Sequence, residues 1–147
     1  NRDQRLRVLQ RLRELVGPLH DRQIGLLGLA FKPNTEDIRE SPALELARLI
    51  LHEGAVAKAY DPVAIDNARQ VLADVQYCQD AYEVARGSDA LVVVTDWNEF
   101  KHLHMATVKD LMRSPVLIDG RNIYDVAEMQ ALGFTYRGIG RGYEPEA

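Results

Sequence analysis

A short polar segment of the chain holds two cations and three carboxylates. They are Lys32, Arg39, Glu36, Asp37 and Glu40. A Lys or an Arg in such a segment can bind phosphate or sugar oxygens, and the N-terminus of a following helix adds positive potential. The carboxylates would repel a phosphate, so we expect them to orient the two cations through ion pairs. A solvated loop with ordinary salt bridges is the alternative interpretation.

Three further loops hold residues that could carry chemistry. Arg121 follows an apolar run, and taken by itself it is more typical of a surface Arg that caps a turn. Asp61 stands where dinucleotide-binding domains place the acid that binds a ribose, but we interpret it as a turn residue. Asp96 and Trp97 are expected to shape their loop or to pack, and we assign no catalytic residue to this chain.

Metal and disulfide chemistry have little support. The one cysteine, Cys78, cannot form an intramolecular disulfide, and we interpret it as structural or incidental. Of the four histidines, His102 and His104 have the spacing of a metal pair but no acidic partner close in sequence. We expect the histidines to be solvated surface residues and predict no metal site.

The elements that must position these residues alternate between strand and helix. Apolar and β-branched runs predict strands at 24–29, 56–60, 75–77, 89–95, 116–119 and 134–139. Helices are expected at 64–72, 80–86, 105–112 and 126–132, with another that Ser41-Pro42 opens and Gly54 stops. Such alternation predicts an α/β fold, a Rossmann-like doubly wound parallel sheet whose ligands bind beyond the strand carboxyl ends.

One amphipathic helix precedes this sheet. Segment 1–16 carries leucines on one side and arginines over much of the rest, and Gly17-Pro18 ends it. The helix could pack on its own domain, or it could be the tail of a longer helix from a preceding domain. In the second case we expect its leucine face to lack cover and to favour self-association.

Composition narrows the class of protein. The chain has 147 residues, which fits one domain, and its net charge of −4 argues against a nucleic-acid partner. No apolar run has membrane-spanning length and the start does not resemble a signal peptide, so we expect no membrane partner and a cytoplasmic location. The spacing of Gly25 and Gly28 does not match the G-x-G-x-x-G fingerprint, and the tail after Gly140 is expected to be loose.

Four blocks in order resemble a known family. They are segments 28–42, 60–62, 95–100 and 119–124, which read GLAFKPNTEDIRESP, YDP, TDWNEF and DGRNIY. Together they resemble the C-terminal, UDP-binding domain of the nucleotide-sugar 6-dehydrogenases, the UDP-glucose/GDP-mannose dehydrogenase family. The resemblance runs from about residue 1 to 140.

The resemblance implies a division of labour between domains. Members oxidise the sugar 6-hydroxyl to a carboxylate with two NAD, through a cysteine thiohemiacetal and thioester. That cysteine lies in a glycine-rich motif that is absent here, so we expect the chain alone to be inactive. Residues 1–20 would end the central domain or linker helix, and residues 21–147 would form the UDP-binding domain. NAD would be bound mainly by the N-terminal domain, and the full-length protein would be a homodimer.

The resemblance also implies roles for single residues. Phe31, Lys32 and Arg121 would bind the UDP-sugar substrate, and Arg39 would reach across a cleft toward NAD. The 32–37 and 119–124 blocks look most like the UDP-glucose group. UDP-N-acetylmannosamine and GDP-mannose are alternative substrates, and a non-catalytic nucleotide-binding module is the alternative from another class.

Overall fold

The structure, a computed structural model, describes residues 2–139. The helices are α1 (Arg2–Val16), α2 (Pro42–His52), α3 (Ile65–Val71), α4 (Ala81–Ala85), α5 (Asn98–Lys101), α6 (Met105–Leu111) and α7 (Val126–Leu132). The strands are β1 (Gln23–Leu27), β2 (Val56–Tyr60), β3 (Gln76–Tyr77), β4 (Ala90–Val93), β5 (Val116–Asp119) and β6 (Thr135–Gly138). The tail after Gly140, expected from the sequence to be loose, lies outside the described residues.

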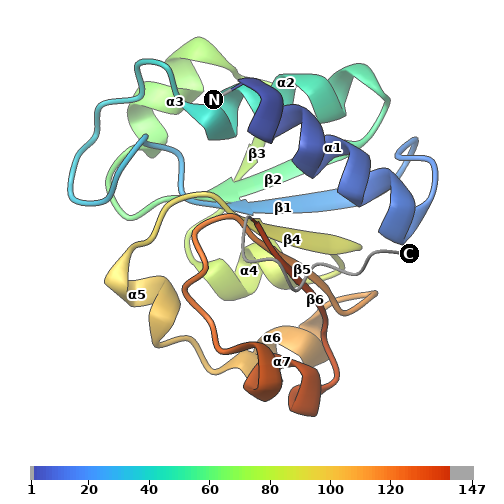
Figure 1. The fold of residues 1–147 in the computed structure, drawn as a ribbon. Helices are drawn as coiled ribbons and strands as arrows, with labels where there is room; N and C mark the ends of the chain where they lie inside the picture. The colour runs from blue at the N-terminus through green and yellow to red at the C-terminus, as the bar shows by residue number, and fades with distance from the viewer. Residues whose placement is uncertain (1, 140–147) are drawn as a thin grey trace.

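The strands form one parallel sheet in the order β3-β2-β1-β4-β5-β6 (Figure 1). Because this order runs outward in both directions from β1 and β4, the predicted doubly wound α/β sheet is confirmed. In register, Leu27 pairs with Tyr60 and Val93, and Val93 pairs with Asp119. The loops that follow β1, β2, β4 and β5 therefore leave the sheet at one common edge.

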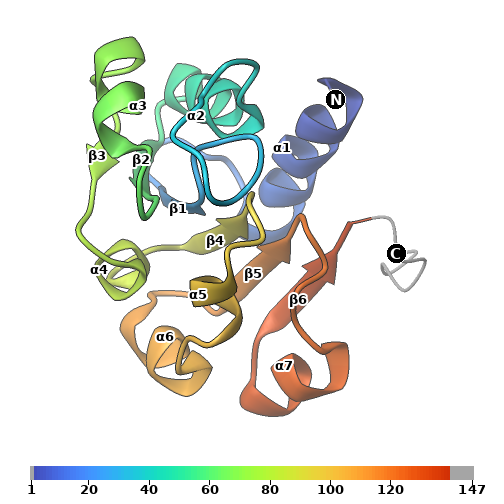
Figure 2. The same cartoon turned by 90° about the vertical axis from the view of Figure 1, so that its left-hand side faces the viewer.

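Helices cover both faces of the sheet. Figure 2 shows α1, α2 and α3 on one side and α4, α5, α6 and α7 on the other. Each side has its own apolar core, one built around Leu12, Ile24 and Ile50 and the other around Phe100, Leu117 and Met129. Parallel strands need such cover, since both of their faces are apolar.

Helix α1 packs on its own domain. Val8, Leu9 and Leu12 are buried in the core that α1 shares with α2 and the sheet, whereas Leu6 remains exposed. The first of the two interpretations, packing on its own domain, therefore agrees with the structure. The uncovered leucine face expected under the second is wrong, because α2 and the sheet cover it. Whether residues 1–20 also belong to a central domain stays a prediction.

The start of α2 follows the sequence prediction. The Ser41 hydroxyl accepts a hydrogen bond from the N–H of Leu44 at 3.1 Å, and Pro42 occupies the first turn. Strand β1 ends two residues before the predicted boundary, because Gly28 turns with a φ of +101°. The short helix α5 was not predicted and lies in what the sequence suggested was a loop. Within residues 2–139, every helix is too short or too polar to cross a membrane.

Candidate functional site

The site lies at the carboxyl edge of the sheet, where the loops after β1, β4 and β5 meet. The loop from residue 28 to 41 is anchored at its root by Asp61, whose buried carboxylate follows β2. Asp61 accepts hydrogen bonds from the N–H groups of Leu29 at 2.8 Å and Ala30 at 3.4 Å. It also accepts bonds from Val63 and Ala64, both at 2.9 Å. The interpretation of Asp61 as a turn residue agrees with these four backbone contacts.

A second anchor comes from the loop after β4. The buried Thr95 hydroxyl donates a hydrogen bond to the carbonyl of Ala30 at 2.8 Å. Two anchors from different strands thus fix the backbone at residues 29 and 30. The exposed side chains of Phe31 and Lys32 follow directly after this anchored backbone.

Phe31, Lys32 and Arg39 line one open cavity of about 760 Å³. Arg39 donates hydrogen bonds to the Asp37 carboxylate at 2.7 to 3.1 Å, which is the ion pairing expected from the sequence. These hydrogen bonds lower the pKa of Asp37 to about 2, with further help from its backbone bond and the nearby positive charges. The Arg39 side chain is 88% exposed, so water screens this pair.

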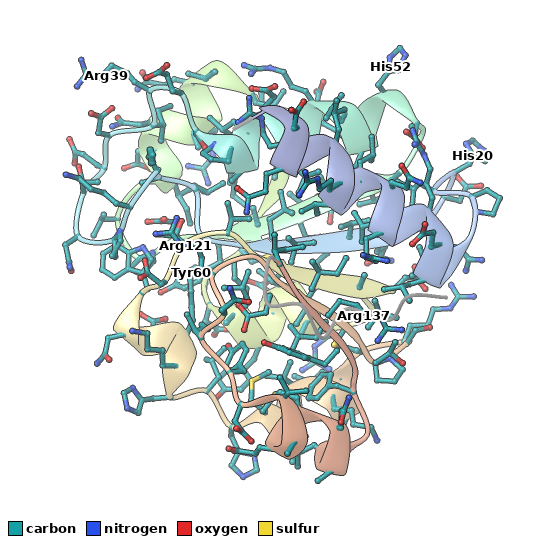
Figure 3. The ribbon with its side chains drawn as sticks, in the orientation of Figure 1. His20, Arg39, His52, Tyr60, Arg121 and Arg137 are labelled. Atoms are coloured by element: carbon teal, nitrogen blue, oxygen red, sulfur yellow. The ribbon has the colours of Figure 1, made fainter. Side chains whose placement is uncertain are left out.

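Arg121 lines a different cavity, of about 330 Å³, between α1, α2 and the ends of β4 and β5. Its backbone N–H donates to the buried Asp119 carboxylate at 3.2 Å, and its guanidinium pairs with Asp96 at 3.4 Å. Figure 3 shows Arg121 near the strand ends, whereas Arg39 projects from the outer part of its loop, away from Arg121. The structure therefore brings Phe31, Lys32 and Arg39 together but places Arg121 in a neighbouring part of the edge.

Residues that sequence reasoning did not select also line the smaller cavity. Its walls are Gln4, Arg5, Val8, Pro42, Leu46, Val92, Val93, Val94, Gly120, Arg121, Asn122 and Ile139. Arg5 was assigned only to the polar face of α1. Its helical position gave no sign that it would line the same cavity as a loop more than a hundred residues later, so only tertiary packing could reveal it.

A hydrogen-bonded pair of side chains, Tyr60 and Glu99, links the end of β2 to α5 at the same edge. The Tyr60 hydroxyl donates a hydrogen bond to the Glu99 carboxylate at 2.8 Å, and its ring packs edge-on to Phe100. Burial, followed by this hydrogen bond and by negative charge nearby, raises the pKa of Tyr60. Tyr60 is therefore a neutral phenol at physiological pH. The segment after β4 therefore holds two of the side chains at this edge: Glu99 binds Tyr60, and Asp96 pairs with Arg121.

The standard dinucleotide site does not fit this edge. In that site a glycine lets the backbone approach the pyrophosphate. Here a Cβ on Gly28 would lie 2.4 Å from the Thr95 hydroxyl, so protein atoms already fill the space. The helix that follows β1 is α2, and it starts only at Pro42, whose nitrogen carries no N–H group that could bind a phosphate. This arrangement agrees with the missing glycine fingerprint.

Cysteine and histidine chemistry finds no support in the described residues. Burial raises the pKa of the Cys78 thiol, so it is not an activated nucleophile. His102 contacts the carbonyl of Asn98 at 2.9 Å, and His104 caps α6 through Thr107. Among residues 2–139, no group of His, Cys, Asp and Glu side chains is arranged to hold a metal ion.

Comparison with known proteins points to the family that the four sequence blocks resemble. Residues 25–126 match the model of the UDP-glucose/GDP-mannose dehydrogenase family, UDP binding domain. UDP-glucose 6-dehydrogenase TuaD of Bacillus subtilis (strain 168) is 43% identical over 99% of this chain and 32% of its own length. The chain thus spans about a third of the curated relatives it matches.

Solved structures agree with the sequence matches. A UDP-glucose dehydrogenase from the hyperthermophilic archaeon Pyrobaculum islandicum superposes with a TM-score of 0.80 at 36% identity, over 94% of this chain and 30% of that one. A UDP-D-ManNAc dehydrogenase from Pyrococcus horikoshii gives a TM-score of 0.71 at 33% identity, over 92% and 29%.

Proposed function

Because the chain belongs to the UDP-glucose/GDP-mannose dehydrogenase family and carries its UDP binding domain, we propose that it binds the nucleotide of UDP-glucose within a dehydrogenase. The observation that carries this proposal is the position of Lys32 and Arg121 in two loops that leave the sheet at one edge. Ligands of open α/β sheets bind at this edge, and both side chains can pair with phosphate or sugar oxygens.

One elongated ligand would occupy both cavities. Phe31 is 53% exposed, so its ring offers apolar surface that a sugar or base can cover. Lys32 would supply a point charge beside it, and Arg121 would bind from the neighbouring cavity. The present partner of Arg121, Asp96, holds the guanidinium at 3.4 Å, a loose pair that a phosphate can replace.

The remaining parts of the reaction are proposed to lie on other domains. The family resemblance implies that NAD accepts hydride from the sugar 6-hydroxyl and that a cysteine outside this chain captures the aldehyde. Arg39 is exposed and held by Asp37, which suits a contact across a cleft to the NAD-binding domain. We keep the proposed division into residues 1–20 and 21–147, and the proposed homodimer of the full-length protein.

We favour UDP-glucose over the two alternative substrates. The relatives at 42% and 43% identity are both UDP-glucose 6-dehydrogenases, whereas the UDP-D-ManNAc enzyme is 33% identical. The family model includes GDP-mannose dehydrogenases, so the base must be tested as well as the sugar.

Calorimetric titration of this chain with UDP, GDP and UDP-glucose tests the proposal. We expect UDP to bind and GDP to bind more weakly, and we expect no dehydrogenase turnover with NAD and UDP-glucose. Lys32→Ala and Arg121→Ala should each weaken UDP about tenfold or more, because each removes a charge-assisted contact. Arg48→Ala, an exposed cation on α2 outside both cavities, is the matched control. UDP binding that neither variant weakens would contradict the proposal.

A further inference from the structure

Helix α1 contributes a cation to the same cavity as Arg121. Arg5 and Gln4 form one wall, and Arg121 belongs to the loop after β5. Val92, Val93 and Val94, at the end of β4, add apolar side chains to the lining. Two arginines in a partly apolar cavity suit an anion, because the low local polarity strengthens charge-assisted hydrogen bonds.

Arg5 is held in place but keeps an unused donor. Its side chain is 16% exposed, and its terminal nitrogen pairs with Glu45 of α2 at 2.8 Å. The Nε atom of Arg5 is buried and has no hydrogen-bond partner among the described residues. Buried donors are nearly always paired, so an unpaired N–H on a residue that lines a cavity is unusual and would gain from an acceptor that reaches it.

We propose that Arg5, together with Arg121, binds the diphosphate of the nucleotide, so that α1 forms part of the substrate site. This inference rests on the proposed function and deepens it, since it names which atoms of UDP the smaller cavity takes. A diphosphate suits the site better than a single carboxylate. It carries several oxygens and more than one negative charge, which two separate guanidinium groups can share.

The carboxylates beside the two arginines serve as holders. Glu45 fixes Arg5 and Asp96 fixes Arg121, and neither carboxylate lines the cavity itself. Such pairs reduce the side-chain entropy that a ligand would otherwise have to remove on binding. Each pair is also partly exposed, so its carboxylate can turn to solvent when a phosphate arrives.

A purely structural role for Arg5 predicts a different pattern. In that case Arg5 only ties α1 to α2 through Glu45, and Glu45→Gln should reproduce the effect of Arg5→Ala on ligand affinity. If Arg5 contacts phosphate, Glu45→Gln leaves the guanidinium in the cavity and frees it from a competing carboxylate. UDP affinity should then be unchanged or higher in Glu45→Gln.

The test is calorimetry of the chain with UDP and with uridine. We expect Arg5→Ala to weaken UDP about tenfold or more while uridine binding stays unchanged, because uridine lacks the diphosphate. Arg7→Ala, an exposed arginine on the same helix that lines neither cavity, is the matched control and should bind UDP like the parent chain. Far-UV circular dichroism verifies that each variant is folded.

The outcomes separate this inference from the proposed function. If UDP binds and Arg121→Ala weakens it but Arg5→Ala does not, the role of Arg5 is refuted and the proposed function stands. If Glu45→Gln weakens UDP as much as Arg5→Ala, Arg5 is a structural residue and the inference also fails. If the parent chain does not bind UDP at all, the proposed function is refuted, and the role of Arg5 is refuted with it.

Discussion

Replacing Asp61 with Asn tests how the site loop is anchored. The carboxylate accepts four backbone hydrogen bonds, from Leu29, Ala30, Val63 and Ala64. An amide keeps one accepting oxygen and turns an NH₂ group toward the other two donors. If the oxygen stays with Val63 and Ala64, the bonds of 2.8 and 3.4 Å to the loop root are lost. Hydrogen bonds to a charged group contribute about 1.5–3 kcal/mol each, and the longer one less. We therefore expect the free energy of unfolding to fall by about 2–4 kcal/mol.

Urea unfolding followed by far-UV circular dichroism measures this loss. Asp66→Asn is the matched control: it makes the same change on a side chain that is 92% exposed and pairs with Arg69 at 3.5 Å. We expect it to change the unfolding free energy by less than about 0.5 kcal/mol. A loss below about 1 kcal/mol in Asp61→Asn would show that the loop root does not depend on this carboxylate. UDP affinity should also fall in Asp61→Asn, since Lys32 starts from the anchored backbone.

Three further predictions concern the same loop. Gly28→Ala should lower the free energy of unfolding by about 2–5 kcal/mol in urea titrations, because its φ is positive and the new Cβ meets Thr95. Ser41→Ala should cost about 1–2 kcal/mol in the same assay, because α2 loses its N-cap. Arg39→Ala should return the pKa of Asp37 from about 2 toward about 4 in an NMR pH titration. Because the folded pKa is depressed, the Asp37–Arg39 pair persists at neutral pH and is lost only as the pH falls toward about 2. An unshifted titration curve in Arg39→Ala would contradict that account.

The strands were predictable because their composition leaves few alternatives. Strands β2 and β5 have the bounds that their apolar runs predicted, and the Ser41-Pro42 start of α2 followed from capping rules. Helix α5 escaped prediction because it has only four residues, of which Phe100 alone is buried. A single buried position in one turn gives no periodic pattern to detect.

The site was predictable only in part. The motif residues Phe31, Lys32 and Arg121 lie on the expected loops, because a parallel sheet brings strand ends to one edge. Whether they bind substrate stays a prediction. The place of Arg5 in the smaller cavity could not be read from the sequence, since periodicity shows which face of α1 is apolar but not what lies against the helix. That same gap explains the wrong expectation of an uncovered leucine face.

The filled space at Gly28 leaves no room for a pyrophosphate directly at the end of β1. A dinucleotide-binding unit keeps the end of its first strand open for pyrophosphate. Here Thr95 and Asp61 occupy that place and use it to anchor the loop. Close backbone approach occurs instead after β5, where a Cβ on Gly120 would lie 2.7 Å from the carbonyl oxygen of Val93. Because Gly120 carries no side chain, the loop can lie tightly against the end of β4 and present Arg121 to the cavity. A close backbone approach that requires glycine is thus found after the fifth strand, beside the smaller cavity, for which we propose a diphosphate ligand.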